Sequence, residues 1–238
     1  HKKPIVQLPL WVNDSIFFNI NSDSKIELKK KYNLNSNNYL IGSFQKDTEG
    51  TKKWKCSNCF KMNNFKINEI NYCCSCNKKK DYEKILYSPK LSKGPDIFVK
   101  VILDMRKKQD NIAVVLTGLR REYLISELKK NNIKYFYFEM LSLEEINELY
   151  NCLDLYLVTS RYEGGPRSIY EASITRTPII STDVGVASLI LDKKSIFDKN
   201  DYKTYKLCNP NVEYAYNKIN QLKKENHIYK FYEKIMCE

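Results

Sequence analysis

Short apolar runs alternate with longer segments of helical spacing along most of this chain. Four apolar runs are predicted to be strands, at residues 112–117, 134–138, 154–159 and 178–182, and helices are predicted between them at 120–131, 142–151 and 166–175. The run at 112–117 is almost wholly apolar, which is typical of a strand covered on both faces of a parallel sheet. Strand–helix repeats of this length predict an α/β fold, in which helices cover both faces of a parallel sheet.

Weaker signals extend this pattern in both directions. A strand that ends in a loop is predicted at 39–44, and a helix at 95–107, where Pro95 suits the first turn. Ser142 is an expected N-cap, and Glu145 stands three residues later, as in a capping box. A strand at 4–12, a short helix at 25–32 and a helical tail at 211–236 complete the predicted elements.

The composition favours a folded chain and narrows its chemistry. Hydrophobic residues make up 42% of the 238 residues and aromatic residues 13%, which is enough to bury a core and argues against a wholly disordered chain. No stretch approaches the roughly 18 apolar residues of a membrane span, and no signal peptide opens the chain. We therefore expect a cytoplasmic, reducing environment. The two histidines, His1 and His227, cannot form a multi-histidine metal site.

One short segment differs from the rest in charge and in cysteine content. The formal net charge of the chain is +12, and residues 51–80 hold eight lysines and one acid, Glu69, so +7 of that charge lies in this segment. Five of the eight cysteines lie there too, whereas Cys152, Cys208 and Cys237 are scattered and are expected to be ordinary thiols. We therefore divide the chain into a main domain, residues 1–50 and 83–238, and an insert, residues 51–82.

The cysteine spacing in the insert is that of a four-thiolate zinc site. Cys56-x2-Cys59 is followed, after thirteen residues, by Cys73-x2-Cys76, and Cys74 lies inside the second turn and points elsewhere. Four thiolates leave no open position for water or substrate, so the predicted zinc is structural. Disulfides or a redox-active CxxC pair are the alternatives.

Three loops that follow predicted strands contain unusual residues: 42–46, 118–121 and 160–167. In the third, Gly164 and Gly165 precede a helix start, where free N–H groups attract phosphate. Glu163 stands before the glycines and Glu171 lies further along the helix, so a ligand with both hydroxyls and phosphates, such as a nucleotide sugar, would fit. A plain tight turn before a solvated helix is the alternative. Arg120 and Arg121 are expected to be surface residues at a helix start.

These residues form a pattern that resembles a known enzyme family. The segment 163–171, Glu-Gly-Gly-Pro-Arg-Ser-Ile-Tyr-Glu, looks like the Glu-x7-Glu motif of retaining GT-B glycosyltransferases of the family-4 type. Residues 153–160 and 177–185 resemble the strands on either side of that motif, and Gly42, Lys93-Gly94 and Thr117-Gly118 follow in family order. The resemblance covers about residues 4–191 apart from the insert. It implies one Rossmann-like half of a GT-B fold, the donor-binding domain of a hexosyltransferase.

The resemblance also implies roles for single residues. Glu171 would bind the ribose hydroxyls of a nucleoside-diphosphate sugar, a UDP- or GDP-sugar first of all, and Glu163 would face the transferred sugar. Lys93 would hold the diphosphate, so no catalytic metal is expected, and Glu163 and Lys93 would be the catalytic residues. Glu163→Gln should leave binding of the free diphosphate nearly unchanged. The remaining donor-binding residues would be Gly42, Lys46, Gly118, Gly164 and Gly165. The family has an arginine after the first-strand glycine where this chain has Ser43, and Lys46 is the proposed substitute.

A further departure concerns the extent of the chain. GT-B enzymes have two such domains, and this chain begins at what looks like the linker between them. The N-terminal domain, which binds an acceptor of unknown identity here, is therefore expected to be missing. The isolated domain is expected to be weakly active or inactive.

The insert has a resemblance of its own. Trp54-x-Cys56-x2-Cys59-x3-Asn63, followed by the second cysteine pair, looks like a zinc finger of the Ran-binding-protein type, although the second pair comes about three residues late. Such fingers bind single-stranded RNA or ubiquitin, and an exposed Trp54 among lysines could stack on a base. A Rossmann-like scaffold that displays a basic finger to RNA or to a protein partner is thus the alternative function. A zinc-stapled loop that rigidifies the donor-site entrance or contacts an acceptor is the simpler interpretation.

Overall fold

The computed structural model describes residues 12–64, 72–79 and 85–225. The strand predicted at 4–12, the end of the tail helix and Cys237 therefore lie outside the described residues, apart from Val12, which is buried and lies in no strand. Within the described part, no helix is long and apolar enough to cross a membrane.

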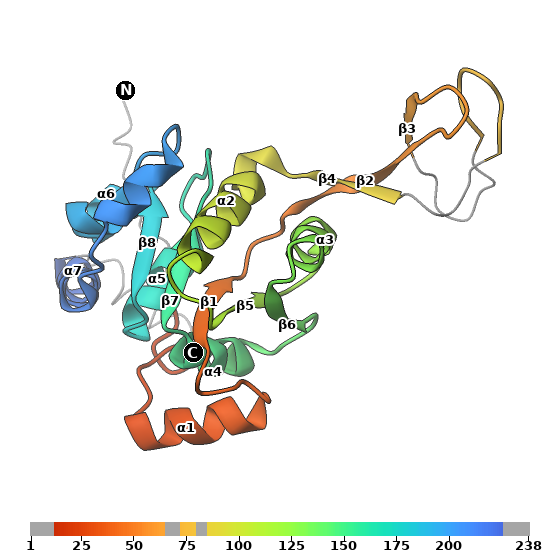
Figure 1. Ribbon diagram of the computed structural model, residues 1–238. Coiled ribbons are helices and arrows are strands. Elements are labelled where there is room, and N and C mark those ends of the chain that lie inside the picture. The colour runs from red at the N-terminus through yellow and green to blue at the C-terminus, as the bar shows by residue number, and fades with distance from the viewer. Residues whose placement is uncertain (1–11, 65–71, 80–84, 226–238) are drawn as a thin grey trace, which may run out of the picture.

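The body of the molecule is a six-stranded, wholly parallel sheet (Figure 1). Its spatial order is β6-β5-β1-β7-β8-β9, so the chain builds the sheet outward from β1 in one direction and then returns to build it in the other. The strands are β1 (Tyr39–Ser43), β5 (Ile112–Thr117), β6 (Lys134–Phe138), β7 (Leu155–Val158), β8 (Ile179–Thr182) and β9 (Ile196–Phe197). This is the order of a doubly wound fold, and the order reverses between β1 and β7.

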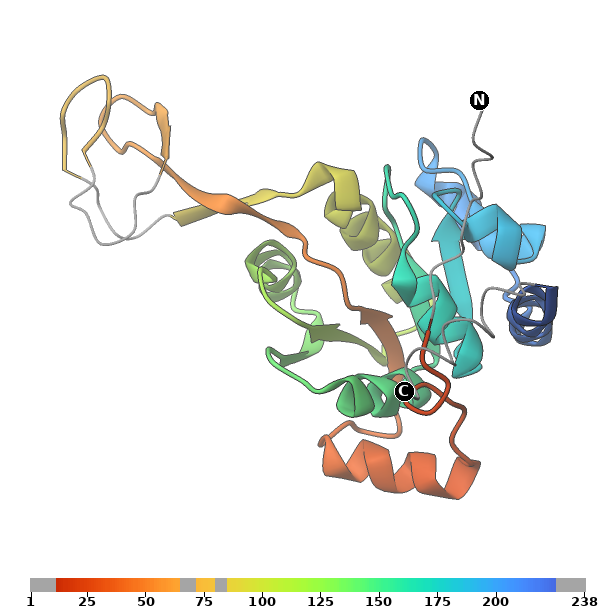
Figure 2. The same ribbon diagram turned by 180° about the vertical axis from the view of Figure 1, so that it is seen from behind.

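Helices cover both faces of the sheet and create two separate cores (Figures 1 and 2). On one face pack α2 (Pro95–Arg106) and α3 (Glu122–Lys130); on the other pack α4 (Leu143–Cys152), α5 (Arg167–Ile174), α6 (Ala187–Ile190) and α7 (Val212–Glu225). Helix α1 (Ser22–Lys31) packs against α4. Successive side chains of β5 alternate between the cores, since Val114 and Leu116 join the first and Ala113 and Val115 the second.

The predicted strands and helices of this body are confirmed to within about two residues, except that the helix predicted at 25–32 begins three residues earlier, at Ser22. Ser142 and Glu145 form the predicted capping box: Ser142 Oγ accepts from Glu145 N at 3.2 Å and Ser142 N donates to Glu145 Oε2 at 2.8 Å. The short elements β9 and α6 were not predicted, because two and four residues are too few to show a period.

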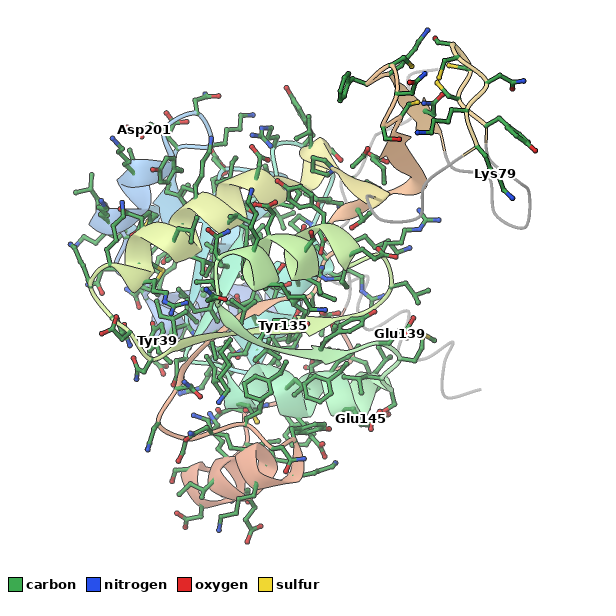
Figure 3. The ribbon with its side chains drawn as sticks, turned by 45° about the vertical axis from the view of Figure 1, so that its right-hand side comes forward. Tyr39, Lys79, Tyr135, Glu139, Glu145 and Asp201 are labelled. Carbon is green, nitrogen blue, oxygen red and sulfur yellow. The ribbon has the colours of Figure 1, made fainter. Side chains whose placement is uncertain are left out.

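The cysteine-rich segment forms an arm that projects from the body (Figures 1 and 2). Strand β2 (Thr48–Lys55) leaves the body and pairs antiparallel with β3 (Met62–Asn64) and with the returning strand β4 (Ile85–Pro89). The ribbon thus starts before residue 51 and ends after residue 82, the predicted limits of the insert. Figure 3 shows Lys79 on the arm, well away from the body residues Tyr135 and Glu145.

Candidate functional site: a cleft at the strand-order reversal and a four-cysteine cluster

A cleft of about 450 Å³ opens beside the carboxyl ends of β1 and β7, where the strand order reverses. Ligands of doubly wound sheets bind at this place. Its walls come from the loop after β1, the segment after β4, helix α4 and the start of α5. The lining residues are Phe44, Gln45, Lys46, Lys90, Lys93, Thr117, Ile146, Tyr150, Glu163, Gly165, Pro166, Arg167, Ser168 and Glu171.

Five of the eight residues predicted for the donor site line this cleft: Lys46, Lys93, Glu163, Gly165 and Glu171. The other three, Gly42, Gly118 and Gly164, do not. Gly42 has a packing reason instead, since a Cβ there would lie 2.2 Å from Cδ1 of Leu153. Gly118 has a left-handed backbone, with φ of 80°, that lets the chain turn after β5.

Lys93 is held at the cleft by a tight turn before α2. It ends the 3-10 turn η1 (Leu91–Lys93), and Gly94 follows in the left-handed conformation at φ of 60°. A Cβ on Gly94 would lie 1.8 Å from the carbonyl oxygen of Thr159, so only glycine lets this turn press against the end of β7. Gly94 is therefore needed for the close backbone approach that brings Lys93 to the cleft.

Glu163 and Lys93, the two predicted catalytic residues, touch each other. The Lys93 ammonium forms an ion pair with Glu163 Oε1, and the two side chains are 25% and 12% exposed. Ser160 Oγ lies 3.0 Å from the same carboxylate oxygen and 2.8 Å from Gln45 Oε1, so its one proton can go to either. The cleft thus holds a positive and a negative group in direct contact.

Glu171 lies deeper, on α5, and faces a tyrosine. The hydroxyl of Tyr150 donates to Glu171 Oε2 at 3.0 Å, and Arg167 Nε lies 3.8 Å from Oε1, one helical turn before it. Burial raises the pKa of the Glu171 carboxyl above its usual range, although Tyr150 and Arg167 oppose that shift. A carboxylate in this place can accept hydrogen bonds from ligand hydroxyls.

An aromatic cluster supports this part of the cleft, and no local pattern in the sequence predicts it. Phe44, Tyr150 and Tyr156 lie with ring centroids 4.7 to 5.3 Å apart. The backbone N–H of Phe44 donates to the hydroxyl of Tyr156 at 3.2 Å. The cluster fixes the loop after β1 against α4, and it orients the Tyr150 hydroxyl toward Glu171.

Two cations of the cleft were also missed. Lys90 follows β4, and Arg167 begins α5. The spacing of Arg167 and Glu171, four residues apart on a helix, was a usable signal. Lys90 had none, because its place depends on the fold of the arm.

The prediction that Arg121 is a surface residue is wrong. Arg121 is 1% exposed, and its Nε lies 3.0 Å from Asp47 Oδ2 in a buried ion pair. Its Nη2 also donates to the carbonyl oxygen of Ser43 at 2.7 Å. Burial lowers the pKa of Arg121 and raises that of Asp47, while each partner opposes the shift of the other. Arg121 therefore holds the loop after β1 through its contacts with Ser43 and Asp47, and it does not line the cleft.

A second cavity, of about 350 Å³, lies at the other end of the strands, near the amino ends of β1, β7 and β8. No carboxylate of the described chain lines it. Its Lys206 is already paired with Asp104 at 2.6 Å, and the Tyr205 hydroxyl donates to the same carboxylate at 3.0 Å. Of these two cavities, the first cleft is the one lined by carboxylates, those of Glu163 and Glu171.

On the arm, the four predicted metal ligands come together. The Sγ atoms of Cys56, Cys59, Cys73 and Cys76 all lie within 4.8 Å of one another. In a tetrahedral zinc site with Zn–S bonds of about 2.3 Å, the sulfurs lie about 3.8 Å apart, so this cluster needs little adjustment to hold an ion. Cys74 is exposed and stands outside the group, as predicted.

The two cysteine turns have matching backbones. In the first, Cys56 N donates to Lys61 O and Phe60 N to Cys56 O, at 2.9 and 3.0 Å; in the second, Cys73 N donates to Lys78 O and Asn77 N to Cys73 O, both at 2.9 Å. Backbone N–H groups of Cys76 and Ser75 lower the pKa of the Cys73 thiol, which favours the thiolate that a metal requires.

Asn63 joins the two turns. Its Nδ2 donates to Lys61 O at 2.9 Å and its Oδ1 accepts from Cys74 N at 2.9 Å. The side chain of Trp54 lies outside the described residues.

Comparison with known proteins adds a family. Residues 75–234 match the family model described as glycosyl transferases group 1. A search of curated proteins finds no match for the sequence.

Solved structures share the fold at low sequence identity. The chain resembles HepE of Anabaena in complex with UDP and glucose (13% identity, TM-score 0.57) and covers 94% of its own length and 54% of that protein. It also resembles the sucrose-phosphate synthase of Thermosynechococcus elongatus, at 10% identity and a TM-score of 0.61, and the match covers 95% of this chain and 51% of that protein. A third similar structure is the C-terminal domain of the group 1 glycosyl transferase LpcC of Francisella tularensis, at 16% identity and a TM-score of 0.57. That match covers 89% of this chain and 97% of the LpcC domain. The chain thus spans about half the length of the first two proteins.

Proposed function

The chain belongs to the glycosyl transferases group 1 family, and we propose that it is the donor-binding part of such an enzyme. The single observation behind this is the convergence of Lys93, Glu163 and Glu171 in one cleft at the strand-order reversal. The fold match to C-terminal glycosyltransferase domains supports the same role. A second domain would then bind the acceptor.

The donor in this proposal is a nucleoside-diphosphate sugar. Glu171 accepts hydrogen bonds from the ribose hydroxyls, and the Tyr150 hydroxyl holds that carboxylate in place. Lys93 binds the diphosphate. UDP is the first nucleotide to test, because the structural relative HepE is found with UDP and UDP-glucose.

The Lys93–Glu163 ion pair fits the charges that a transfer reaction develops. When the bond between the sugar's anomeric carbon and the phosphate oxygen breaks, the nucleoside diphosphate leaves with an added negative charge and the sugar ring becomes positive. In this proposal Lys93 stabilises the first charge and Glu163 the second, and the direct contact between the two side chains supports it. Preorganised groups of this kind often provide the largest part of catalysis. We propose that transfer retains the configuration of the sugar, as the Glu-x7-Glu pattern suggests, and that protein cations serve in place of a catalytic metal.

For the arm we propose a structural zinc ion held by the four cysteines. The donor set is closed, so the ion would supply fold stability and no chemistry. In small domains such binding energy is folding energy.

A second candidate function rests on the arm alone. Phe60 is 67% exposed and adopts a left-handed backbone at φ of 59°, which is unfavourable for a bulky residue. Each cysteine turn also has an exposed lysine: Lys61 follows Phe60 directly, and Lys78 lies at the second turn. An aromatic ring held out beside basic residues suits RNA or a protein partner. Salt-sensitive RNA binding without nucleotide-sugar binding would favour this function.

A thermal-shift panel with UDP, GDP, ADP and their sugars tests the proposal. A ligand of the folded state at one hundred times its Kd adds about 2.7 kcal/mol, or about 5–10 °C for a chain of this size. A rise with one nucleotide and its sugar supports the donor role. No shift with any of them, confirmed by calorimetry, contradicts it.

A further inference from the structure

The arm enters and leaves the body at the edge of the cleft. Strand β2 begins at Thr48 and β4 ends at Pro89, and these two residues face each other in the ribbon. Beyond that pair, Lys90 N donates to the carbonyl oxygen of Asp47 at 2.7 Å. We call residues 46–48 and 89–90 the root of the arm. Lys46 and Lys90 both line the cleft; Lys46 lies just before the outgoing strand β2 and Lys90 just after the returning strand β4.

The two root lysines differ from the other cations of the cleft because they have no acidic partner among the described residues. Lys93 is paired with Glu163, and Arg167 lies 3.8 Å from Glu171. The ammonium groups of Lys46 and Lys90 have no hydrogen bond or ion pair among the described residues. The cleft therefore has two uncompensated positive charges, both at the root.

The root is also rigidly held. Asp47, between the two lysines, forms the buried ion pair with Arg121, and its Oδ1 accepts from Leu124 N at 3.2 Å. The backbone N–H groups of Asp47 and Thr48 both donate to Arg120 O at 3.1 Å. The root is therefore fixed to the start of α3, and the two lysines project from a fixed backbone.

We propose that Lys46 and Lys90 form a second phosphate-binding position at the root of the arm and stabilise the leaving nucleoside diphosphate. This rests on the donor role proposed above. The ion pair of Lys93 with Glu163 has no net charge, so it cannot balance the negative charges of the two phosphates. The two root lysines add two positive charges, one for each phosphate.

Calorimetric titration of UDP, UMP and uridine into single variants tests the proposal. Lys90→Ala and Lys46→Ala should each weaken UDP binding by about tenfold, since each removes a charge-assisted hydrogen bond to phosphate. Binding of uridine should not change. Lys90→Arg keeps the charge and should bind UDP within about threefold of the wild type.

Lys30→Ala is the matched control. Lys30 is exposed on α1, which leads into the amino end of β1, and its removal changes the net charge by the same amount. It should leave all three affinities unchanged. Thermal unfolding of each variant checks that the fold is retained.

The outcomes separate this proposal from the donor role. Wild-type protein that binds UDP, together with a Lys90→Ala variant that binds it equally well, overturns the second phosphate position alone. A Lys90→Ala variant that loses uridine and UDP equally also overturns it, because the lysine would then act through the fold. Wild-type protein that binds no nucleotide overturns both.

Discussion

Glu163→Gln should separate nucleotide binding from transfer. Glutamine keeps the size of the side chain and removes its charge. In the structure the Glu163 carboxylate forms an ion pair with the Lys93 ammonium, and that ammonium is the group proposed to bind the diphosphate. Removing the carboxylate charge frees Lys93 for the phosphate and also removes a negative group that would repel it.

The size of the effect follows from the geometry. A phosphate on the other side of the Lys93 ammonium would lie two hydrogen bonds, or about 6 Å, from the Glu163 carboxylate. Two unit charges at that distance repel by about 0.7 kcal/mol in water and about 3 kcal/mol at an effective dielectric constant of 20. Because the side chains are 25% and 12% exposed, an intermediate value applies. We expect about 1–2 kcal/mol, or about 5- to 30-fold tighter binding of UDP.

Transfer should respond in the opposite direction. The carboxylate that faces the developing positive charge on the sugar is lost, and the loss of one preorganised electrostatic group costs about 100- to 1,000-fold in rate. A gain in product affinity with a loss in rate is the signature of a group used in the transition state.

Calorimetry measures UDP affinity, and release of UDP from UDP-glucose in an assembled, active enzyme measures transfer. Glu27→Gln, which removes an exposed carboxylate from α1, is the control and should change neither. The reasoning is refuted if Glu163→Gln binds UDP no more tightly than the wild type, because the ion pair would then not compete with the phosphate.

Three other changes test the remaining contacts. Glu171→Ala should weaken UDP binding by about 1.5–3 kcal/mol, through loss of ribose hydrogen bonds to a charged group. Because burial raises the pKa of Glu171, the UDP affinity of the wild type should fall as the pH drops through a value above the ordinary glutamate pKa. Calorimetry should show no such fall for Glu171→Gln. Asp47→Asn should lower the free energy of unfolding in urea by about 3–5 kcal/mol, since Arg121 is left charged and buried, and the double variant Asp47→Leu/Arg121→Met should recover most of it. Purified protein should contain one zinc ion by elemental analysis, and chelation should expose the arm to proteolysis while UDP affinity stays the same.

The body of the fold was predictable because its signals are local. Each buried strand is a short apolar run, and each helix has its own period or cap, as Ser142 shows. The arm was predictable as a separate segment whose four cysteines come together, but not as a ribbon. Residues 48–55 are polar and lysine-rich, so they lack the apolar alternation of a half-buried strand, and they pair with a strand some thirty residues later.

The site was predictable where one motif contains its residues, and unpredictable where distant segments meet. Glu163 and Glu171 share a segment of nine residues. Their partners Lys93 and Tyr150 come from other elements, so the ion pair and the tyrosine hydrogen bond depend on the folded chain. For this reason the sequence alone led to no expected change in diphosphate binding for Glu163→Gln, whereas the structure leads to a gain.

Different contacts hold the tip and the root of the arm, and this determines how the metal relates to the cleft. At the tip, the four cysteine sulfurs lie together and Asn63 joins the two cysteine turns. At the root, Thr48 Oγ1 accepts from Tyr123 N at 2.7 Å, and Asp47 pairs with Arg121. The ribbon register shifts just beyond Thr48, so the strands do not join root and tip into one regular element. Because the two sets of contacts share no residue, we expect loss of the proposed ion to remove contacts at the tip alone and to leave the root lysines in place at the cleft.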